Sequence, residues 1–206
     1  MKKYSYDGKE VSKELFEQSH ENYRKSFPNH PLSHLNDYKL NSGILIESGS
    51  LYGDTIYRAL NFGYKKVISI EINKELFHYV SNRFESEIKE GIVELHLGSS
   101  IDVLPKILKN INEPVTFWLD AHLHGNSFGK VHDAPIIQEL DIIKSHNINS
   151  HNILVDDMRI IRTQGWGSGN MEQLVIDKVK NINDKYTITY GHGLVNNDVL
   201  IAENNG

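Results

Sequence analysis

From residue 43 onward, short apolar segments alternate with segments of helical periodicity, and this alternation limits the possible folds more than any other feature of the sequence. Five of these segments have the length and the Val/Ile content of buried strands: GILIES (43–48), KKVISIEI (65–72), GIVELHLG (91–98), VTFWLD (115–120) and NILVDD (152–157). Strands joined through helices form right-handed crossovers between parallel strands. The alternation therefore predicts a doubly wound, mostly parallel α/β sheet with helices on both faces.

The segments between and after these strands predict the helices and the end of the sheet. Apolar residues recur at helical spacing in the following segments: 53–63, Asn73 to Ile88, 102–111, Asp133 to Ile143, and Asn170 to Val179. The later segment KYTITYGHGLVNNDVLIAEN (185–204) contains two strands around a Gly-rich turn. We therefore expect seven strands, of which the last two form an antiparallel hairpin.

The chain of 206 residues fits a single domain. Residues 1–40 are polar, and Ser12 to Tyr23 carries an amphipathic helical pattern. We interpret this segment as a helical appendage or lid in front of a core at 43–203. Alternatively, its helix simply packs on an edge of the sheet.

Composition excludes several classes of function. The chain has no cysteine, which rules out a disulfide framework, a thiolate nucleophile and a cysteine-type zinc site. The formal charge of −5 argues only weakly against a nucleic-acid partner, because a local basic patch could still provide the basic face that such a partner needs. We also see neither a signal sequence nor an apolar stretch of the roughly 20 residues that a membrane span needs, so we expect a cytoplasmic protein that acts on a small molecule.

Acidic or small polar residues end every predicted parallel strand. Ligands of such sheets bind beyond the carboxyl ends of the strands, near the point where the strand order reverses. Any one of these residues alone is more often a helix cap or a structural turn. The series falls on one edge of one sheet: Glu47 to Thr55 after the first strand, Glu71 after the second, Gly98 to Ser100 after the third, Asp120 after the fourth, and Asp156 and Asp157 after the fifth.

These strand ends resemble the motifs of the class I S-adenosylmethionine (SAM)-dependent methyltransferases. ESGSLYGDT (47–55) resembles motif I, VISIEINKEL (67–76) resembles the second motif and HLGSSIDVLPKI (96–107) the third. Motif I departs from the commoner Gly-x-Gly-x-Gly pattern, because Ser48, Ser50 and Leu51 surround a single central glycine. The resemblance implies SAM as cofactor, with Glu71 on its ribose. The implied cofactor-binding residues are Glu47, Gly49, Ser50, Gly53, Asp54, Thr55, Glu71, Ile72, Ser99, Ser100 and Asp120.

The acidic strand ends further resemble the metal-dependent O-methyltransferases of the catechol and sugar-modifying types. In these enzymes an aspartate after the fourth strand and a pair after the fifth hold Mg²⁺, and Asp120, Asp156 and Asp157 match those positions. Carboxylate oxygens suit this hard cation, which lowers the pKa of a bound substrate hydroxyl. The competing interpretation is that Asp156 or Asp157 caps the loop that follows.

A histidine is the candidate for the base. The catechol-type enzymes carry a lysine where this chain has Leu123, so that role does not transfer. His122 and His124 flank the position, and His132 follows in the long polar loop HLHGNSFGKVHDA (122–134). Imidazole has a suitable pKa for accepting a hydroxyl proton. We therefore expect His122 or His124, together with Asp120, to be catalytic.

Two other functions remain open at this stage. A metal-dependent hydrolase could use the same carboxylates and histidines, but it would leave Glu71 without a role. A methyltransferase-like binding protein could keep the fold without turnover. The arrangement WLDAH…PIIQELDII…ILVDDMR resembles small methyltransferase-like proteins associated with the modification of surface polysaccharides. This resemblance implies a hydroxyl of a sugar or a similar polar metabolite, such as a polysaccharide precursor, as the substrate. The metal, the methylated atom and the oligomeric state are not determined by the sequence.

Overall fold

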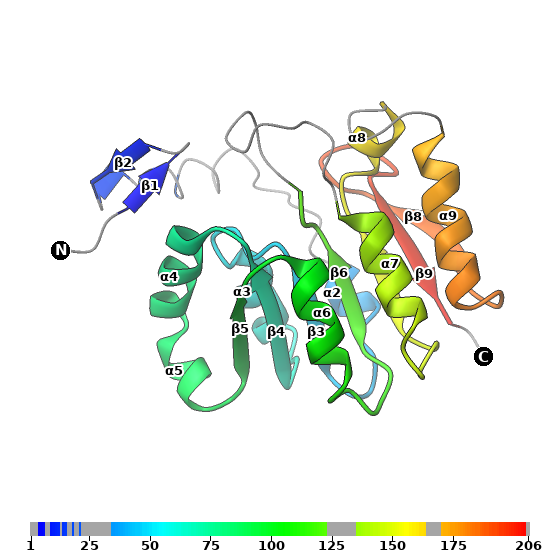
Figure 1. Cartoon of the computed structure of the whole chain (residues 1–206), viewed down its shortest axis with the longest axis horizontal. Helices are drawn as coiled ribbons and strands as arrows, with labels where there is room; N and C mark the ends of the chain where they lie inside the picture. Colours follow the sequence, from blue (N-terminus) through cyan, green and yellow to red (C-terminus); the bar gives the residue numbers. More distant parts are fainter. Residues whose placement is uncertain are drawn as a thin grey trace.

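The computed structural model of the chain describes residues 4–6, 9–12, 14–15, 18, 21, 34–122, 135–163 and 170–204 (Figure 1). Its strands are β1 (Tyr4–Tyr6), β2 (Lys9–Val11), β3 (Ile44–Ser48), β4 (Lys66–Glu71), β5 (Val93–Leu97), β6 (Thr116–Leu119), β7 (Asn152–Val155), β8 (Thr187–Gly191) and β9 (Val199–Glu203). Its helices are α2 (His34–Asp37), α3 (Asp54–Asn61), α4 (Lys74–Arg83), α5 (Glu85–Lys89), α6 (Ser100–Leu108), α7 (Ile136–Lys144), α8 (Met158–Arg162) and α9 (Met171–Ile182).

The main sheet has seven strands in the order β5-β4-β3-β6-β7-β9-β8. The strands from β5 to β7 run parallel, whereas β9 pairs antiparallel with both β7 and β8. The order reverses between β3 and β6, which defines the edge where ligands of such sheets bind. The predicted doubly wound sheet with a terminal antiparallel hairpin is confirmed.

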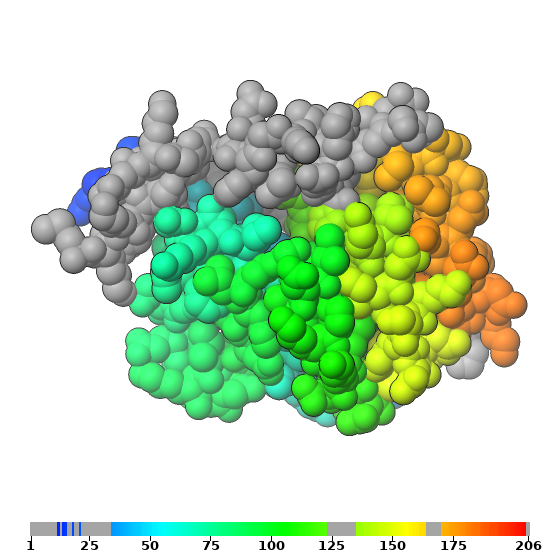
Figure 2. Space-filling model, in the orientation of Figure 1, coloured from blue at the N-terminus to red at the C-terminus, as the bar shows by residue number. Residues whose placement is uncertain are grey.

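Helices cover both faces of the sheet because successive residues of each parallel strand point to opposite sides. On one face, Ile46 packs in a core with Leu104 of α6 and Leu140 of α7. On the other face, its neighbour Leu45 packs with Ile56 of α3. In the space-filling view, the side chains of α6, α7 and α9 close over the first of these faces (Figure 2). The core therefore lies in two layers, one on either side of the sheet.

The prediction of one continuous helix from Asn73 to Ile88 is wrong. Asn73 caps its start as expected, accepting hydrogen bonds from the backbone N–H groups of Glu75 (2.9 Å) and Leu76 (3.1 Å). At Phe84, however, φ is −115° and ψ is 31°, so the chain leaves the helix and α5 starts anew. Phe84 is almost fully buried, and packing of its ring overrides the helical periodicity.

Other boundaries differ from the expectations by a few residues. α6 begins at Ser100 and tolerates Pro105 inside it, α7 begins at Ile136 after Pro135, and α9 continues to Ile182. The one-turn helix α8 was not predicted. It follows β7 directly and lies at the upper edge of the sheet in Figure 1.

The N-terminal segment contains a hairpin that the sequence analysis did not predict. β1 and β2 pair antiparallel in a separate two-stranded sheet. Within the expected helix Ser12 to Tyr23, residues 14, 15, 18 and 21 are helical, and its other residues except Ser12 lie outside the described part of the chain. The proposed lid remains a prediction. No helix in the described part of the chain is long and apolar enough to cross a membrane.

Candidate active site

The turn after β3 depends on two glycines. Gly49 has φ 88° and Gly53 has φ 79°, in the left-handed region that side chains disfavour. A Cβ atom on Gly49 would lie 2.7 Å from the carbonyl oxygen of Asp120, and one on Gly53 would lie 2.7 Å from the ring of Phe84. Only glycine therefore allows the turn to approach β6 and α4 this closely, and the turn ends at the N-terminus of α3.

Glu71, the last residue of β4, is held in a fixed orientation beside this turn. Its Oε2 accepts a hydrogen bond from the backbone N–H of Leu51 (2.9 Å), and its Oε1 accepts one from that of Asn73 (2.8 Å). Burial raises the pKa of Glu71, while these backbone donors act in the opposite direction. Each oxygen is thus anchored by a backbone donor, and a carboxylate oxygen can accept more than one hydrogen bond.

Glu47 lies beneath the turn, fully buried. Its Oε2 accepts a hydrogen bond from the Ser69 hydroxyl at 2.5 Å, and the Ser69 and Ser50 hydroxyls are 2.6 Å apart. Its Oε1 has no hydrogen-bond partner within the described residues. Burial raises the pKa of Glu47 to about 8, although the hydroxyls of Ser69 and Thr55 oppose this effect. The Glu47 carboxyl is therefore mostly protonated at neutral pH.

Apolar side chains are exposed around the ends of β4 and β5. The exposed fractions are 57% for Ile72, 45% for Leu97 and 37% for Ile101. Ser99 and Ser100 begin α6 at the same place. The sequence analysis included Ile72 in the site but missed Leu97, the last residue of β5, and Ile101, in the first turn of α6. Together these residues offer an apolar surface next to Glu71.

Asp54 stabilises the turn between β3 and α3. It forms an ion pair with Arg83 of α4 at 2.9 Å, and Arg83 also donates to the backbone carbonyl of Tyr52. This position ties α3 to α4. The structure thus gives Asp54 a structural contact, and its predicted contact with the cofactor remains untested.

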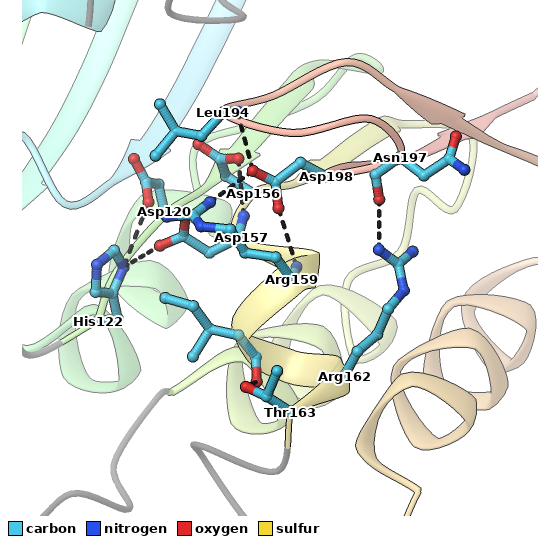
Figure 3. Close-up of polar contacts among 11 residues, drawn as sticks. Asp120, His122, Asp156, Asp157, Arg159, Arg162, Thr163, Leu194, Asn197 and Asp198 are labelled. Carbon is cyan, nitrogen blue, oxygen red and sulfur yellow. Dashed lines mark hydrogen bonds and ion pairs between the residues drawn. The ribbon is translucent and has the colours of Figure 1, made fainter. Parts of the chain in front are cut away.

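Asp120, His122 and Asp157 converge at the ends of β6 and β7 (Figure 3). His122 Nδ1 lies 3.4 Å from Asp120 Oδ1 and 3.2 Å from Asp157 Oδ2. One ligand atom from each of the three residues lies within 4.8 Å of the others. The structure therefore brings together two of the three predicted metal ligands and one of the two predicted catalytic histidines. His124 and His132 lie outside the described residues.

Asp157 also belongs to a second acidic group, with Asp156 and Asp198, whose ligand atoms again lie within 4.8 Å of one another. Arg159 donates to Asp198 Oδ2 at 2.6 Å and forms an ion pair with Asp157 Oδ1. The predicted triad of Asp120, Asp156 and Asp157 is thus divided between two overlapping groups that share Asp157. Arg159 and Asp198 were missed by the sequence analysis.

The protonation of the cluster is set by burial and by mutual repulsion. Burial, and next the charge of Asp157, raise the pKa of Asp120. Burial and the charges of Asp120 and Asp157 raise the pKa of Asp156. Burial lowers the pKa of His122, although the charges of Asp157 and Asp156 act against it. The cluster therefore holds a neutral imidazole among carboxylates that a cation would stabilise.

A further carboxylate reaches the same place from α7. Glu139 is 1% exposed, and it lines a pocket together with Asp120, His122 and Asp156. Its Oε1 has no hydrogen-bond partner in the described part of the chain. Burial raises the pKa of Glu139 to about 7, against the effect of the Ser100 and Ser48 hydroxyls. The sequence analysis missed Glu139, although a carboxylate three residues after Ile136 falls on the apolar side of the helix.

Comparison with known proteins identifies the fold. No family model and no curated protein match the sequence. Among solved structures, the O-methyltransferase from Bacillus cereus in complex with SAH is similar with a TM-score of 0.59 and 16% identity, over 94% of this chain and 91% of that chain. The O-methyltransferase TomG from Streptomyces achromogenes, involved in tomaymycin synthesis and solved in complex with SAM, gives a TM-score of 0.60 and 13% identity, over 95% and 91%.

Methyltransferases of another acceptor type share the fold as well. The N-methyltransferase NodS from Bradyrhizobium japonicum WM9 is similar with a TM-score of 0.52 and 13% identity, over 86% of this chain and 94% of that chain. The fold is therefore that of the class I SAM-dependent methyltransferases, as the resemblance in the sequence implied. Because O- and N-methyltransferases share this fold, the acceptor must be inferred from the site itself.

Proposed function

We propose that the protein is a SAM-dependent methyltransferase that methylates a hydroxyl group of a small polar or sugar-like substrate with the assistance of a divalent cation. The observation that carries this proposal is the convergence of Asp120, His122 and Asp157 at the edge that also presents Glu71 and the glycine turn. β6, which Asp120 follows directly, is the neighbour of β3, and β3 leads into the turn. A cofactor on the turn would thus have an acidic, histidine-containing cluster beside it.

The cofactor half of the site fits an adenosine moiety. The two anchored oxygens of Glu71 suit the two vicinal hydroxyls of a ribose, because each oxygen retains acceptor capacity after bonding to the backbone. Ile72, Leu97 and Ile101 provide the apolar surface on which an adenine ring can pack. The N-terminus of α3, reached through Gly53, supplies backbone N–H groups at the same edge.

The acceptor half fits a hard divalent cation. Asp120 and Asp157 offer carboxylate oxygens, the ligands that suit Mg²⁺ or Mn²⁺. Glu139 lines the same pocket, and its buried Oε1 has no hydrogen-bond partner in the described part of the chain. A divalent cation bound here would lower the pKa of a substrate hydroxyl and help to orient it.

His122 is placed to take up the proton that the hydroxyl loses. Its Nδ1 faces Asp157 Oδ2 and Asp120 Oδ1, so we assign the Nδ1 proton to a hydrogen bond with these carboxylates. Nε2 then carries the lone pair that accepts a proton. The burial that lowers the pKa of His122 keeps the imidazole neutral before the reaction, as a general base requires.

Calorimetry with SAM, followed by methyl transfer from labelled SAM to a panel of catechols, sugars and nucleotide sugars with Mg²⁺, tests the proposal. SAM binding with Mg²⁺-dependent labelling of a hydroxyl supports it. Failure to bind SAM, with metal-dependent hydrolysis of ester substrates, would instead identify a hydrolase. SAM binding without labelling of any acceptor in the panel would favour a methyltransferase-like binding protein.

A further inference from the structure

Arg159 and Asp198 contact the acidic cluster but have no role in the proposed reaction. Asp198 lies between β8 and β9, 41 residues after Asp157 in the sequence, and it is fully buried. Arg159 lies in the one-turn helix α8, directly after β7. Figure 3 shows the two side chains beside Asp157, on the opposite side of it from His122.

Asp198 is fixed by donors from two segments. Its Oδ1 accepts a hydrogen bond from the backbone N–H of Arg159 (2.9 Å). Its Oδ2 accepts from Arg159 Nη1 (2.6 Å) and from the backbone N–H of Leu194 (3.0 Å). Its carbonyl oxygen accepts from the backbone N–H of Met158 (2.8 Å). The β8–β9 hairpin is therefore connected to α8 through a fully bonded carboxylate.

Arg159 extends this connection to Asp157. The Arg159 Nη1 atom that donates to Asp198 also forms the ion pair with Asp157 Oδ1. The other oxygen, Asp157 Oδ2, faces His122 at 3.2 Å. The Asp157 backbone is in the left-handed region, with φ 61°, which is uncommon for residues other than glycine, although aspartate adopts it more often than most. One oxygen of Asp157 is thus held by Arg159 while the other is directed toward Asp120 and His122.

We propose that Asp198 and Arg159 are positioning residues that orient Asp157 for ligation, so that the β8–β9 hairpin sets the affinity of the site for a divalent cation. This inference rests on the proposed function, because it concerns the cation that the proposal places at Asp120 and Asp157. Groups that orient a ligating carboxylate commonly change metal affinity about 10–100-fold when they are removed.

The sign of the effect separates positioning from simple electrostatics. Removing a positive charge next to a cation site reduces repulsion and should tighten cation binding if Arg159 acts only through its charge. If Arg159 acts by orienting Asp157, its removal frees the carboxylate to rotate and weakens binding. A merely structural role would change the stability of the fold without changing the cation affinity of the folded protein.

Mn²⁺ binding, followed by electron paramagnetic resonance without SAM or substrate, provides the measurement. We expect Arg159→Met to weaken Mn²⁺ binding about tenfold or more. Arg159→Lys, which keeps the charge but lacks the rigid, planar guanidinium, should recover part of this loss. Asp198→Asn, which leaves Arg159 without its second carboxylate, should weaken Mn²⁺ binding in the same direction.

Arg162→Met is the matched control. Arg162 lies in the same helix and also anchors the hairpin, donating to the backbone carbonyl of Asn197 at 2.6 Å, but its ion pair is with Glu172. This variant should lose a comparable hairpin contact and keep the Mn²⁺ affinity of the wild type within about twofold, since additivity holds for separate sites. Thermal unfolding of each variant verifies that the protein measured is folded.

Each outcome bears on one of the two proposals. A wild type that does not bind Mn²⁺ would overturn the divalent-cation part of the proposed function, and this inference with it. A wild type that binds Mn²⁺, with Arg159→Met binding as tightly or more tightly, would overturn the inference alone. If Arg159→Met does not fold, Arg159→Lys decides, because unchanged affinity in that variant contradicts positioning.

Discussion

At the scale of single residues, Glu71 is the side chain whose removal should most directly affect cofactor binding. Hydrogen bonds to a charged group contribute about 1.5–3 kcal/mol, so Glu71→Ala should weaken SAM binding by about 10–100-fold in calorimetry. The exposed Glu90, between α5 and the start of β5, provides the control, and Glu90→Ala should bind SAM as the wild type does. Unchanged SAM affinity in a folded Glu71→Ala protein would refute the ribose assignment.

Substitution of His122 tests whether this histidine accepts the proton of the substrate hydroxyl. Because general base catalysis contributes roughly 10²–10⁴-fold, His122→Gln should lower kcat at least about 100-fold while leaving the Kd for SAM nearly unchanged. His124→Gln, measured in parallel, tests the second predicted histidine. His96, paired with Glu94 at the surface of β5, serves as the control, and its Gln variant should retain activity. Full activity in both the His122 and the His124 variants would remove histidine from the mechanism.

At the scale of elements, two histidines connect the starts of β6 and β7, at the edge of the sheet opposite the site. His151 Nδ1 accepts a hydrogen bond from the backbone N–H of Val115 (3.1 Å). Its Nε2 must then carry the proton and donate to His146 Nδ1 (3.1 Å), whose Nε2 in turn donates to the carbonyl oxygen of Ile111 (3.1 Å). A second proton on His151 would break the bond to Val115.

These hydrogen bonds of His151 and His146 predict that the folded protein loses stability in acid. Burial, and next the neighbouring His146, lower the pKa of His151 from 6.5 to about 4. Between pH 6.5 and pH 4 the unfolded state therefore binds more protons than the folded state. The free energy of unfolding is highest above pH 6.5 and falls by about 3 kcal/mol as the pH drops toward 4. Denaturant unfolding at pH 7 and pH 4.5 should show a smaller decrease for His151→Gln than for the wild type. The control is His78→Gln, at an exposed position. Equal decreases in the free energy of unfolding for the wild type, His151→Gln and His78→Gln would contradict the prediction.

The elements that the sequence predicted correctly are those with a local signal. Each parallel strand shows a short apolar run, and Asn73 shows a cap three residues before Leu76. α8 has only one turn, too short for a periodic pattern, and the break at Phe84 depends on how its ring packs under Gly53. Local pattern thus recovered the sheet and most helices, while tertiary packing decided the breaks.

The distinction between local pattern and tertiary packing also explains which residues of the site could be predicted from the sequence. Asp120 and Asp157 were predictable because strand ends of a parallel sheet meet at one edge. Arg159 and Asp198 could not be paired from the sequence, because 39 residues and two chain reversals separate them. Glu139 had a signal, since it falls within the apolar stripe of α7, but a charged residue in such a stripe is usually exposed.

At the scale of the whole molecule, the two halves of the site should respond separately to removal of the cation. EDTA should abolish methyl transfer while SAM binding, which we assign to the Glu71 side of the sheet, remains largely intact, and Mg²⁺ or Mn²⁺ should restore activity. Asp120→Asn, measured in the same assay with saturating Mg²⁺, should resemble the chelated wild type. Full turnover in EDTA would leave an ordinary base-driven methyltransferase as the better account.

The antiparallel position of β9 has a consequence for how the protein is made. β9 lies inside the sheet, between β7 and β8, although it is the last strand in the sequence. Glu71, Asp120 and Asp157 all leave the ribosome before Asp198, so a nascent chain can fold the parallel part of the sheet while its acidic cluster still lacks the partner of Arg159. Pairing of β9 with β7 brings Asp198 to Arg159, so only a chain that includes β9 can hold the complete cluster.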